Sequence, residues 1–264
     1  MGYIAAISWN PDPVAFDLFG PLAFTWYGLT WSLSMLVGYY LAIWMFKREQ
    51  VNDVDPSNVV TVIFLSCLVG ARLGQVIFYD LEYFMDYPSE ILKVWNGGLA
   101  SHGAVIAGVV SVLYLSKKYA SIGFLWLMDR MAIIVLSAGS FIRFGNFMNS
   151  ELYGTPTGSD YGVIFTMHDT IARHPVQLYE SVWLMSCFLA FMMLYRNLKA
   201  WNDGFFACLF LSVVFIGRLL LEFIKESPDL ALGLSRTQWL SVPVILIGLG
   251  GLIYVKRRAV STQA

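Results

Sequence analysis

The sequence predicts an all-α, polytopic integral membrane protein with about seven transmembrane helices. Hydrophobic residues make up 58% of the 264 residues and charged residues only 13%, whereas a soluble domain carries about a quarter charged residues. The apolar residues gather in continuous runs that approach or reach the roughly 17–25 helical residues needed to cross a bilayer. The aromatic content of 16% suits a protein with Trp and Tyr at both membrane interfaces.

Seven apolar runs follow one another along the chain. They span about residues 21–46, 59–79, 99–115, 124–144, 176–195, 205–224 and 239–255. Because lipid offers the backbone no hydrogen bonds, continuous runs of this length are expected to be helices. The chain shows no internal repeat and no linker, so residues 1–264 are expected to form a single transmembrane domain.

Lysine and arginine concentrate at one set of helix ends, and the positive-inside rule places that set in the cytoplasm. This set contains Lys47, Arg48, Lys117, Lys118, Arg130, Arg196, Lys199, Lys256, Arg257 and Arg258. The opposite set contains only Lys93, Arg173, Lys225 and Arg236. With seven crossings, the N-terminus is expected outside and the C-terminus in the cytoplasm. The extracytoplasmic segments then lie near residues 80–98 and 145–174, and the first is expected to lie in the interface.

The net charge of −1 gives no reason to expect a nucleic-acid partner. Cys67, Cys187 and Cys208 each lie inside an apolar run, so we interpret them as small buried hydrophobic residues rather than a disulfide framework. None of the three has the spacing of a metal site. Nothing in the sequence suggests a metal or an organic cofactor.

Three arginines, Arg72, Arg143 and Arg218, fall inside the predicted spans. A centrally placed arginine costs about 2.5–3.5 kcal/mol on insertion scales. Three of them cost roughly 8–10 kcal/mol, which is comparable with the whole stability of a domain, so they are expected to face a cavity or partners. At about 1.5 Å per residue, each lies roughly 20–28 Å from the cytoplasmic start of its helix. That depth is in the outer half of the bilayer.

Further polar residues are expected at the same level, from several helices and one outer loop. They are Tyr27, His102, Asn146, Asn149 and Glu151. Guanidinium groups in a partly dry pocket bind phosphate bidentately. At this depth the available phosphate is a phospholipid headgroup, so the pattern indicates a phospholipid-handling protein.

Each residue also has a simpler explanation. Arg218 and Glu222 are four residues apart and could neutralise each other on one helix. His102 could be a satisfied interfacial histidine, and Tyr27 could belong to the aromatic belt. The glycines that flank Arg72 are typical of helix packing. These explanations do not account for the convergence of all the residues on one layer.

Residues 143–154, R-F-G-N-F-M-N-S-E-L-Y-G, resemble the signature R-x-G-N-F-x-N-x-E-x-x-G of the prolipoprotein diacylglyceryl transferase family. Further blocks resemble the family in the same order along the chain. They are W-Y-G at 26–28, G-A-R-L-G at 70–74, G-G-L-A-S-H-G at 97–103, R-H-P-V-Q-L-Y-E at 173–180 and R-L-L-L-E-F at 218–223. Two positions depart from the family pattern, since Ile142 replaces a usual Gly and Val214 a frequent Tyr.

The resemblance implies an enzyme of the bacterial cytoplasmic (inner) membrane, with residues 1–264 as one transmembrane catalytic domain among membrane lipids. Its substrates would be phosphatidylglycerol and the lipobox cysteine of a preprolipoprotein signal peptide. The thiol would attack a glycerol carbon and glycerol phosphate would leave, giving a thioether in the first step of lipoprotein maturation. From the residues alone, a transporter or channel for an anionic solute or lipid is the alternative. The odd helix count and the lack of a repeat disfavour it.

The candidate residues divide by expected role. Arg143 and Arg218 are expected to stabilise the charge that develops on the departing phosphate. His102 is the candidate base for the thiol, whose free pKa is about 8.5. The expected substrate-binding residues are Tyr27, Arg72, Asn146, Asn149, Glu151, Gly154 and Glu222.

Overall fold

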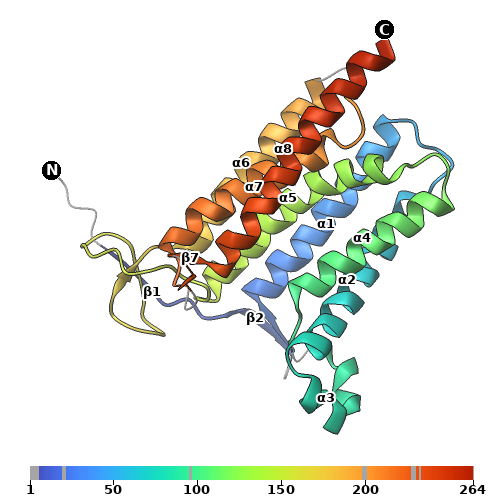
Figure 1. The fold of residues 1–264 in the computed structure, drawn as a ribbon. Coiled ribbons are helices and arrows are strands. Elements are labelled where there is room, and N and C mark those ends of the chain that lie inside the picture. The colour runs from blue at the N-terminus through green and yellow to red at the C-terminus, as the bar shows by residue number, and fades with distance from the viewer. Residues whose placement is uncertain are drawn as a thin grey trace. The chain divides into compact units, whose positions relative to one another are not determined.

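The computed structural model describes residues 6–19, 22–94, 97–197, 201–226, 230–231 and 233–263. The chain is mostly helical, as predicted, and it divides into two compact units. The first unit comprises Met1–Gly38 and Asp129–Ala264, and the second comprises Tyr39–Met128. Helices α1 (Trp26–Arg48) and α5 (Phe124–Met148) contribute residues to both units (Figure 1).

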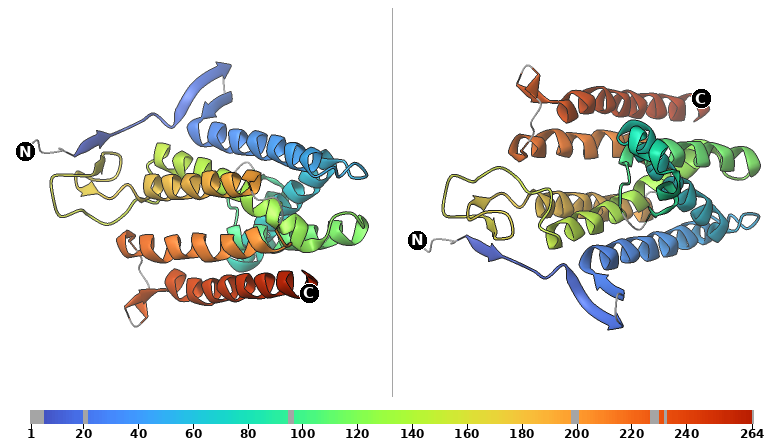
Figure 2. Two further views of the ribbon diagram at one scale, coloured as in Figure 1. Left: turned by 90° about the horizontal axis from the view of Figure 1, so that it is seen from above. Right: turned by 90° about the horizontal axis from the view of Figure 1, so that it is seen from below.

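The later helices of the first unit lie side by side. After α5 they are α6 (Val176–Asn197), α7 (Phe205–Leu221) and α8 (Arg236–Gln263), and a short 3-10 turn, η3 (Glu222–Ile224), follows α7. α6 packs on α7, and α7 packs on α8 along its length (Figure 2). A Cβ added to Gly248 of α8 would lie 2.5 Å from Ser212 Oγ of α7. Small residues therefore let these two helices approach closely.

Short strands occupy the segments that precede and connect these helices, and the apolar runs did not predict them. β1 (Ile7–Trp9) pairs in parallel with β4 (Val163–Phe165), which pairs antiparallel with β5 (Ala172–Arg173). Two further antiparallel pairs are β2 (Val14–Phe19) with β3 (Leu22–Thr25) and β6 (Leu230–Ala231) with β7 (Leu234–Ser235). Strands of two to six residues are too short to show a periodic pattern in the sequence.

The second unit is built on an antiparallel pair of helices, α2 (Pro56–Phe78) and α4 (Ser101–Lys118). The connection between them contains α3 (Leu81–Asp86) and a 3-10 segment, η1 (Pro88–Leu92). A Cβ on Gly103 of α4 would lie 2.0 Å from the carbonyl oxygen of Gly70 in α2. The backbones of α2 and α4 therefore touch at this level, where only glycine fits.

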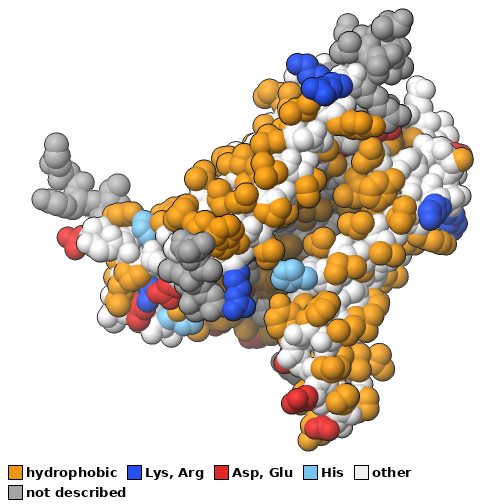
Figure 3. Space-filling view, in the orientation of Figure 1, with side chains coloured by type: hydrophobic (Ala, Val, Ile, Leu, Met, Phe, Trp, Pro, Cys, Tyr) orange, Lys and Arg blue, Asp and Glu red, His pale blue; other side chains and the backbone are white. Residues whose placement is uncertain are grey.

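The helices are those of a multi-pass membrane protein. Six have the length and composition to cross a bilayer, among the residues that the structure describes: α1, α2, α5, α6, Phe205–Ile224 and the part Arg236–Arg257 of α8. The seventh predicted span, near 99–115, corresponds to α4, which has 18 residues and contains His102 and two lysines. Apolar side chains cover the visible faces of the long helices, as expected for surfaces that contact lipid (Figure 3).

Two predicted boundaries need correction. The first helix begins at Trp26 rather than near residue 21, because the apolar residues before it belong to β3. The fourth predicted span continues to Met148 rather than ending near residue 144. Gly145 and Asn146 are therefore helical and not part of the following loop.

Candidate active site

The helix ends that carry the signature meet in the first unit, and we call this region the signature end. It comprises the last turns of α5 and α7, the first turns of α1 and α6, and η3. Gly145 lets the start of α1 pack directly on the end of α5. A Cβ on Gly145 would lie 2.3 Å from Thr30 Oγ1 and 3.1 Å from Tyr27 Cδ2. This contact places Tyr27 at the level of the last turn of α5.

Arg143 of α5 is paired with an acidic residue of α6 at the signature end. Its Nε forms an ion pair with Glu180 Oε2 of α6, with 2.9 Å between the two atoms, and its side chain is 24% exposed. The other oxygen of Glu180 accepts from Lys225 Nζ at 2.5 Å. Within the described part of the chain, Arg143 Nη1 and Nη2 donate to no residue. The outer edge of this guanidinium is thus open to an anion.

Glu222 and Arg218 are not paired in the described structure, although they lie four residues apart. α7 ends at Leu221, and the buried carboxylate of Glu222 accepts a hydrogen bond from Ser235 Oγ at 2.9 Å. It also lies 4.0 Å from Lys225 Nζ. The side chain of Arg218 is exposed. The simple explanation that these two residues neutralise each other is therefore not what the structure shows.

Glu151 lies between two residues in the left-handed region, Ser150 with a φ of 56° and Leu152 with a φ of 60°. This conformation is costly for residues other than glycine and gathers at functional sites. The carboxylate of Glu151 accepts from Asn146 Nδ2 at 2.7 Å, and its backbone carbonyl accepts from Gln177 Nε2 at 2.6 Å. The strained turn thereby holds Glu151 over the end of α5.

Tyr27 and Asn149 complete the predicted residues near this turn. Tyr27 is within electrostatic reach of both Glu151 and Arg143. Asn149 is half-buried, and its backbone N–H donates to the carbonyl of Gly145 at 3.0 Å, which continues the helical turn. Both residues belong to the first unit.

Gly154 lies where three backbone segments pass close together, namely its own, that of His174 and that of Ile224. Its N–H donates to the carbonyl of His174 at 2.9 Å, and a Cβ on it would lie 2.5 Å from the carbonyl oxygen of Ile224. Gly154 also forms an isolated bridge with Lys225. The end of the signature is therefore fixed beside the segment that carries Lys225.

Arg173 stabilises the place where these three backbone segments meet. It donates to Asp169 Oδ2 at 2.7 Å and to Glu226 Oε1 at 2.5 Å, and its guanidinium lies 4.9 Å from the ring centre of Tyr153. Its hydrogen bonds hold the pKa of the Asp169 carboxyl below its usual range. Arg173 thus links the loop after the signature to the segment after η3.

In the second unit, the guanidinium of Arg72 donates its hydrogen bonds to backbone carbonyl groups. Its guanidinium donates to the carbonyls of Ile91 at 2.9 Å, Gly97 at 2.7 Å and Gly98 at 3.0 Å, and it also reaches the carbonyl of Glu90. The side chain is buried and lies over the ring of Phe84. Arg72 therefore anchors the connection between α2 and α4.

His102 is the second residue of α4 and is exposed. The N–H of Ala100 donates to the carbonyl of Ala71 at 2.9 Å, and Gly103 touches Gly70, so the start of α4 is fixed against the middle of α2. His102 and Arg72 consequently lie at one level of the second unit. The remaining predicted site residues, Tyr27, Arg143, Asn146, Asn149, Glu151, Gly154, Arg218 and Glu222, belong to the first unit.

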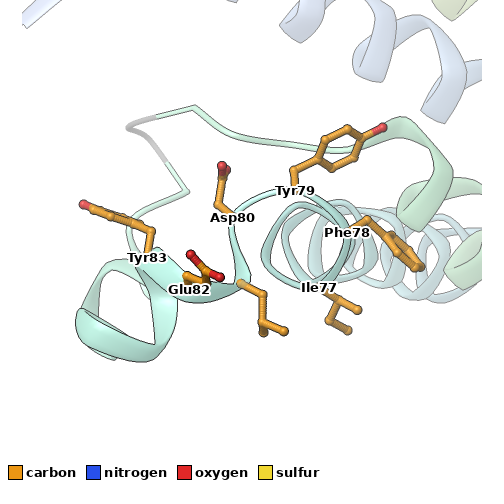
Figure 4. A pocket seen from close by; sticks show the side chains of 7 residues that line it. Ile77, Phe78, Tyr79, Asp80, Glu82 and Tyr83 are labelled. Carbon is orange, nitrogen blue, oxygen red and sulfur yellow. The ribbon is translucent and has the colours of Figure 1, made fainter.

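A shallow cavity of about 460 Å³ lies at the end of α2 and the start of α3. Tyr79, Asp80, Glu82 and Tyr83 are among its lining residues (Figure 4). It contains none of the predicted site residues. In the described ranges, no group of three His, Cys, Asp or Glu side chains could hold a metal ion, and all three cysteines are free.

The sequence reasoning missed three residues of the cluster, namely Glu180, Lys225 and Gln177. Glu180 could have been found, because an acidic residue inside a predicted span is a candidate for function by default. Gln177 is fully buried, and its Oε1 has no hydrogen-bond partner among the described residues. Lys225 lies at a helix end, where a lysine gives no signal in the sequence.

The fold and the cluster together define a multi-pass membrane protein with a cluster of charged residues at the signature end of its helices. The family model described as prolipoprotein diacylglyceryl transferase matches residues 13–254. The chain belongs to this family.

Relatives in several bacteria support the assignment. The chain is 41% identical over 245 residues to the phosphatidylglycerol–prolipoprotein diacylglyceryl transferase of Tolumonas auensis, covering 91% of this chain and 94% of the relative. It is 38% identical to the protein of the same name from Chloroherpeton thalassium, covering 92% and 91%. With the Porphyromonas gingivalis protein of that name it shares 34% identity, covering 93% of each. The chain therefore matches these relatives along nearly their whole length.

Proposed function

We propose that this chain transfers the diacylglyceryl group of phosphatidylglycerol to the lipobox cysteine of preprolipoproteins. The products are a thioether and glycerol phosphate, and the reaction begins lipoprotein maturation. The observation that carries the proposal is the open edge of Arg143, held at the signature end of membrane-spanning helices in a chain of this family. A phosphodiester headgroup fits such an edge bidentately.

The chemistry follows from charge. The thiolate sulfur attacks the glycerol carbon that bears the phosphate, and the C–O bond breaks with its electron pair on the leaving oxygen. The donor phosphodiester carries one negative charge, and the departing phosphate monoester gains a second. This second charge is absent in the ground state and develops as the C–O bond breaks. Arg143 and Arg218 therefore stabilise the transition state more than the bound substrate.

The remaining residues have supporting roles in the proposal. His102 accepts the thiol proton, since a neutral imidazole can act as a general base. Tyr27, Asn146 and Asn149 donate hydrogen bonds to the headgroup. Glu151 and Glu222 orient neighbouring donors rather than handle protons, in keeping with their contacts to Asn146 and Ser235. Arg72 supports the connection that leads into His102.

We also propose seven crossings of the bacterial cytoplasmic membrane, with the N-terminus outside and the C-terminus inside. The antiparallel packing of α2 and α4 supports the seventh crossing. Gly103 of α4 lies beside Gly70 and Gly74, and Gly108 lies beside Cys67, so α4 returns along α2. The 15 residues from Gly103 to Lys118 cover about 22 Å. That length brings α4 back to the level at which α2 begins.

The experiment uses purified protein, vesicles that contain phosphatidylglycerol, and a synthetic lipobox peptide. Mass spectrometry should detect a peptide that carries a thioether-linked diacylglyceryl group, together with free glycerol phosphate. The same peptide with serine in place of cysteine is the control and should stay unmodified. Movement of lipid or anion across the vesicle without any product would instead support the transporter, which the family membership does not favour.

A further inference from the structure

We infer that Glu180 is a positioning residue that turns Arg143 toward the phosphate, and that Lys225 keeps Glu180 from neutralising it. The inference rests on the proposed function and deepens it. Glu180 lies in the first turn and a half of α6, and its side chain is only 10% exposed. It bridges two cations from different elements, α5 and the segment after η3.

The geometry of the first contact leaves one edge of Arg143 available. A guanidinium can bind a carboxylate or phosphate bidentately through two of its N–H groups. Glu180 Oε2 approaches Arg143 most closely at Nε, at 2.9 Å, and among the described residues the two terminal nitrogens donate no hydrogen bond to Glu180. Because this contact fixes the rotation of the guanidinium plane, the edge formed by Nη1 and Nη2 keeps one direction. A phosphate that meets this edge finds its donors already oriented.

The second contact explains why the carboxylate does not close over Arg143. Lys225 Nζ binds Oε1 of Glu180 at 2.5 Å, while Arg143 binds Oε2. Each oxygen therefore has its own cation. Without Lys225, the carboxylate is free to rotate and to present both oxygens to Arg143, which would satisfy the donors that a phosphate needs.

The charges lead to the same conclusion. Arg143 and Lys225 place two positive charges beside Glu180, and Glu222 lies 4.0 Å from Lys225 Nζ, so the removal of Lys225 takes away one of the two cations near the site of the phosphodiester. In a half-buried site this difference matters more than it would in water, because charges are screened less there.

The backbone fixes Lys225 in this position independently of its charge. Lys225 forms an isolated bridge with Gly154, and the N–H of Thr155 donates to the carbonyl of Ile224 at 2.9 Å. The side chain of Lys225 is 18% exposed. The backbone contact between Gly154 and Lys225 thus places the ammonium group of Lys225 beside Glu180.

The test is a double-mutant cycle in the thioether assay, with Glu180→Gln, Lys225→Met and the combined variant. Glu180→Gln should lower the turnover rate by about 10- to 100-fold, the scale for losing a hydrogen bond to a charged group. The loss should fall mainly on kcat rather than on KM for phosphatidylglycerol, because the second phosphate charge forms in the transition state. Lys225→Met alone should also be slow. The combined variant should be no slower than Glu180→Gln, since no carboxylate remains for Lys225 to hold.

Controls separate this role from a structural one. Asp86→Asn, an exposed carboxylate at the end of α3, should retain the wild-type rate. Lys225→Arg should restore most of the activity that Lys225→Met loses. If Glu180→Gln does not yield a monodisperse protein in detergent, Glu180→Ala takes its place in the cycle, with the same expected coupling, because it also leaves no carboxylate for Lys225 to hold.

Two results overturn the inference. One is a Glu180→Gln variant with the wild-type kcat, and the other is a combined variant whose loss is the product of the two single losses. Both require an active wild type, so they leave the proposed function intact. A wild-type protein that forms no thioether would instead contradict the proposed function itself.

Discussion

Gly145 of α5 lies against Thr30 of α1 so closely that a Cβ on Gly145 would come within 2.3 Å of Thr30 Oγ1. Thr30 Oγ1 in turn donates to the carbonyl of Tyr27 at 3.0 Å. The start of α1 therefore contacts the last turn of α5 through the side chains of Thr30 and Tyr27, which lie against the backbone of Gly145. This contact sets the separation of Tyr27 from Arg143.

Replacing Gly145 with Ala should separate these two turns. We expect the unfolding free energy to fall by about 1–3 kcal/mol, the usual cost of overpacking, and turnover to fall because Arg143 moves. Thermal unfolding in detergent and the thioether assay measure the two effects. Gly250→Ala is the matched control, since a Cβ on Gly250 of α8 would meet nothing within 4 Å. A Gly145→Ala protein with wild-type stability would contradict the close contact.

Replacing Arg143 with Ala should lower turnover by about 100- to 1,000-fold, the scale for removing one donor to a developing oxyanion. The protein should still insert in the membrane, because the change removes a charge from a helix. Arg143→Lys should recover little of the loss, since lysine has no Nε to pair with Glu180 and no planar fork. The purified variants are compared in the thioether assay. Near-normal turnover of Arg143→Ala would show that the phosphate role is wrong.

Arg218 and Glu222 should respond differently to conservative changes. Arg218→Lys keeps the charge and loses the bidentate fork, so we expect a clear loss of activity. Glu222→Gln should cost less than Arg218→Ala, because an amide oxygen can still accept from Ser235 Oγ. Rates of the three variants under saturating phosphatidylglycerol give the ranking. The reverse order would indicate that Glu222 handles a proton.

The dependence of turnover on pH should identify the base. An imidazole accepts a proton only when it is neutral, and imidazoles usually change charge between about pH 5 and 8. With His102 as the base, wild-type activity should fall in acid, where an imidazole is protonated and cannot accept the proton of the thiol. His102→Gln should abolish that acidic limb and lower the rate by about two to four orders of magnitude. A rate–pH series with a saturating lipobox peptide measures both effects. An active variant that keeps the limb would exclude His102 as the base.

The contact between Asp169 and Arg173 should make the stability of the folded protein depend on pH in the acidic range. Arg173 lowers the pKa of Asp169 in the folded protein, so the contact stabilises the fold at any pH above the unfolded value of about 3.9. That contribution is lost as the pH falls through the lowered folded pKa. Asp169→Asn should therefore lower Tm at neutral pH, and the difference from wild type should shrink toward pH 3. Tm in detergent measured against pH tests this, and a constant difference would contradict it.

The apolar runs predicted the spanning helices well, because lipid forces long apolar segments to be helical. α6 begins at Val176, where the pattern placed it, and α5 begins at Phe124. The pattern failed at the start of α1, where an apolar run continues backward into β3. Hydrophobicity alone does not distinguish a short apolar strand from a helix turn.

The candidate site was predictable where its residues are close in the sequence. Arg143, Asn146 and Glu151 fall within one signature, and the structure joins Asn146 to Glu151. Glu180 and Lys225 meet across 45 residues, and no local pattern contains such a pair. Depth alone also grouped Arg72 with Arg143, whereas in the structure the donors of Arg72 reach backbone carbonyls.

Arg72 has a consequence for protein engineering. Its partners in the connection between α2 and α4 are carbonyl groups, which every amino acid possesses. Positions 90 and 91 can therefore change identity without loss of these bonds. Gly97 and Gly98, with φ of 84° and 71°, cannot change as freely, and a Cβ on Gly98 would lie 2.9 Å from Arg72 Nη1. A fluorescent label or an affinity tag attached at the exposed Leu92 would thus report on the protein while its anchor remains intact.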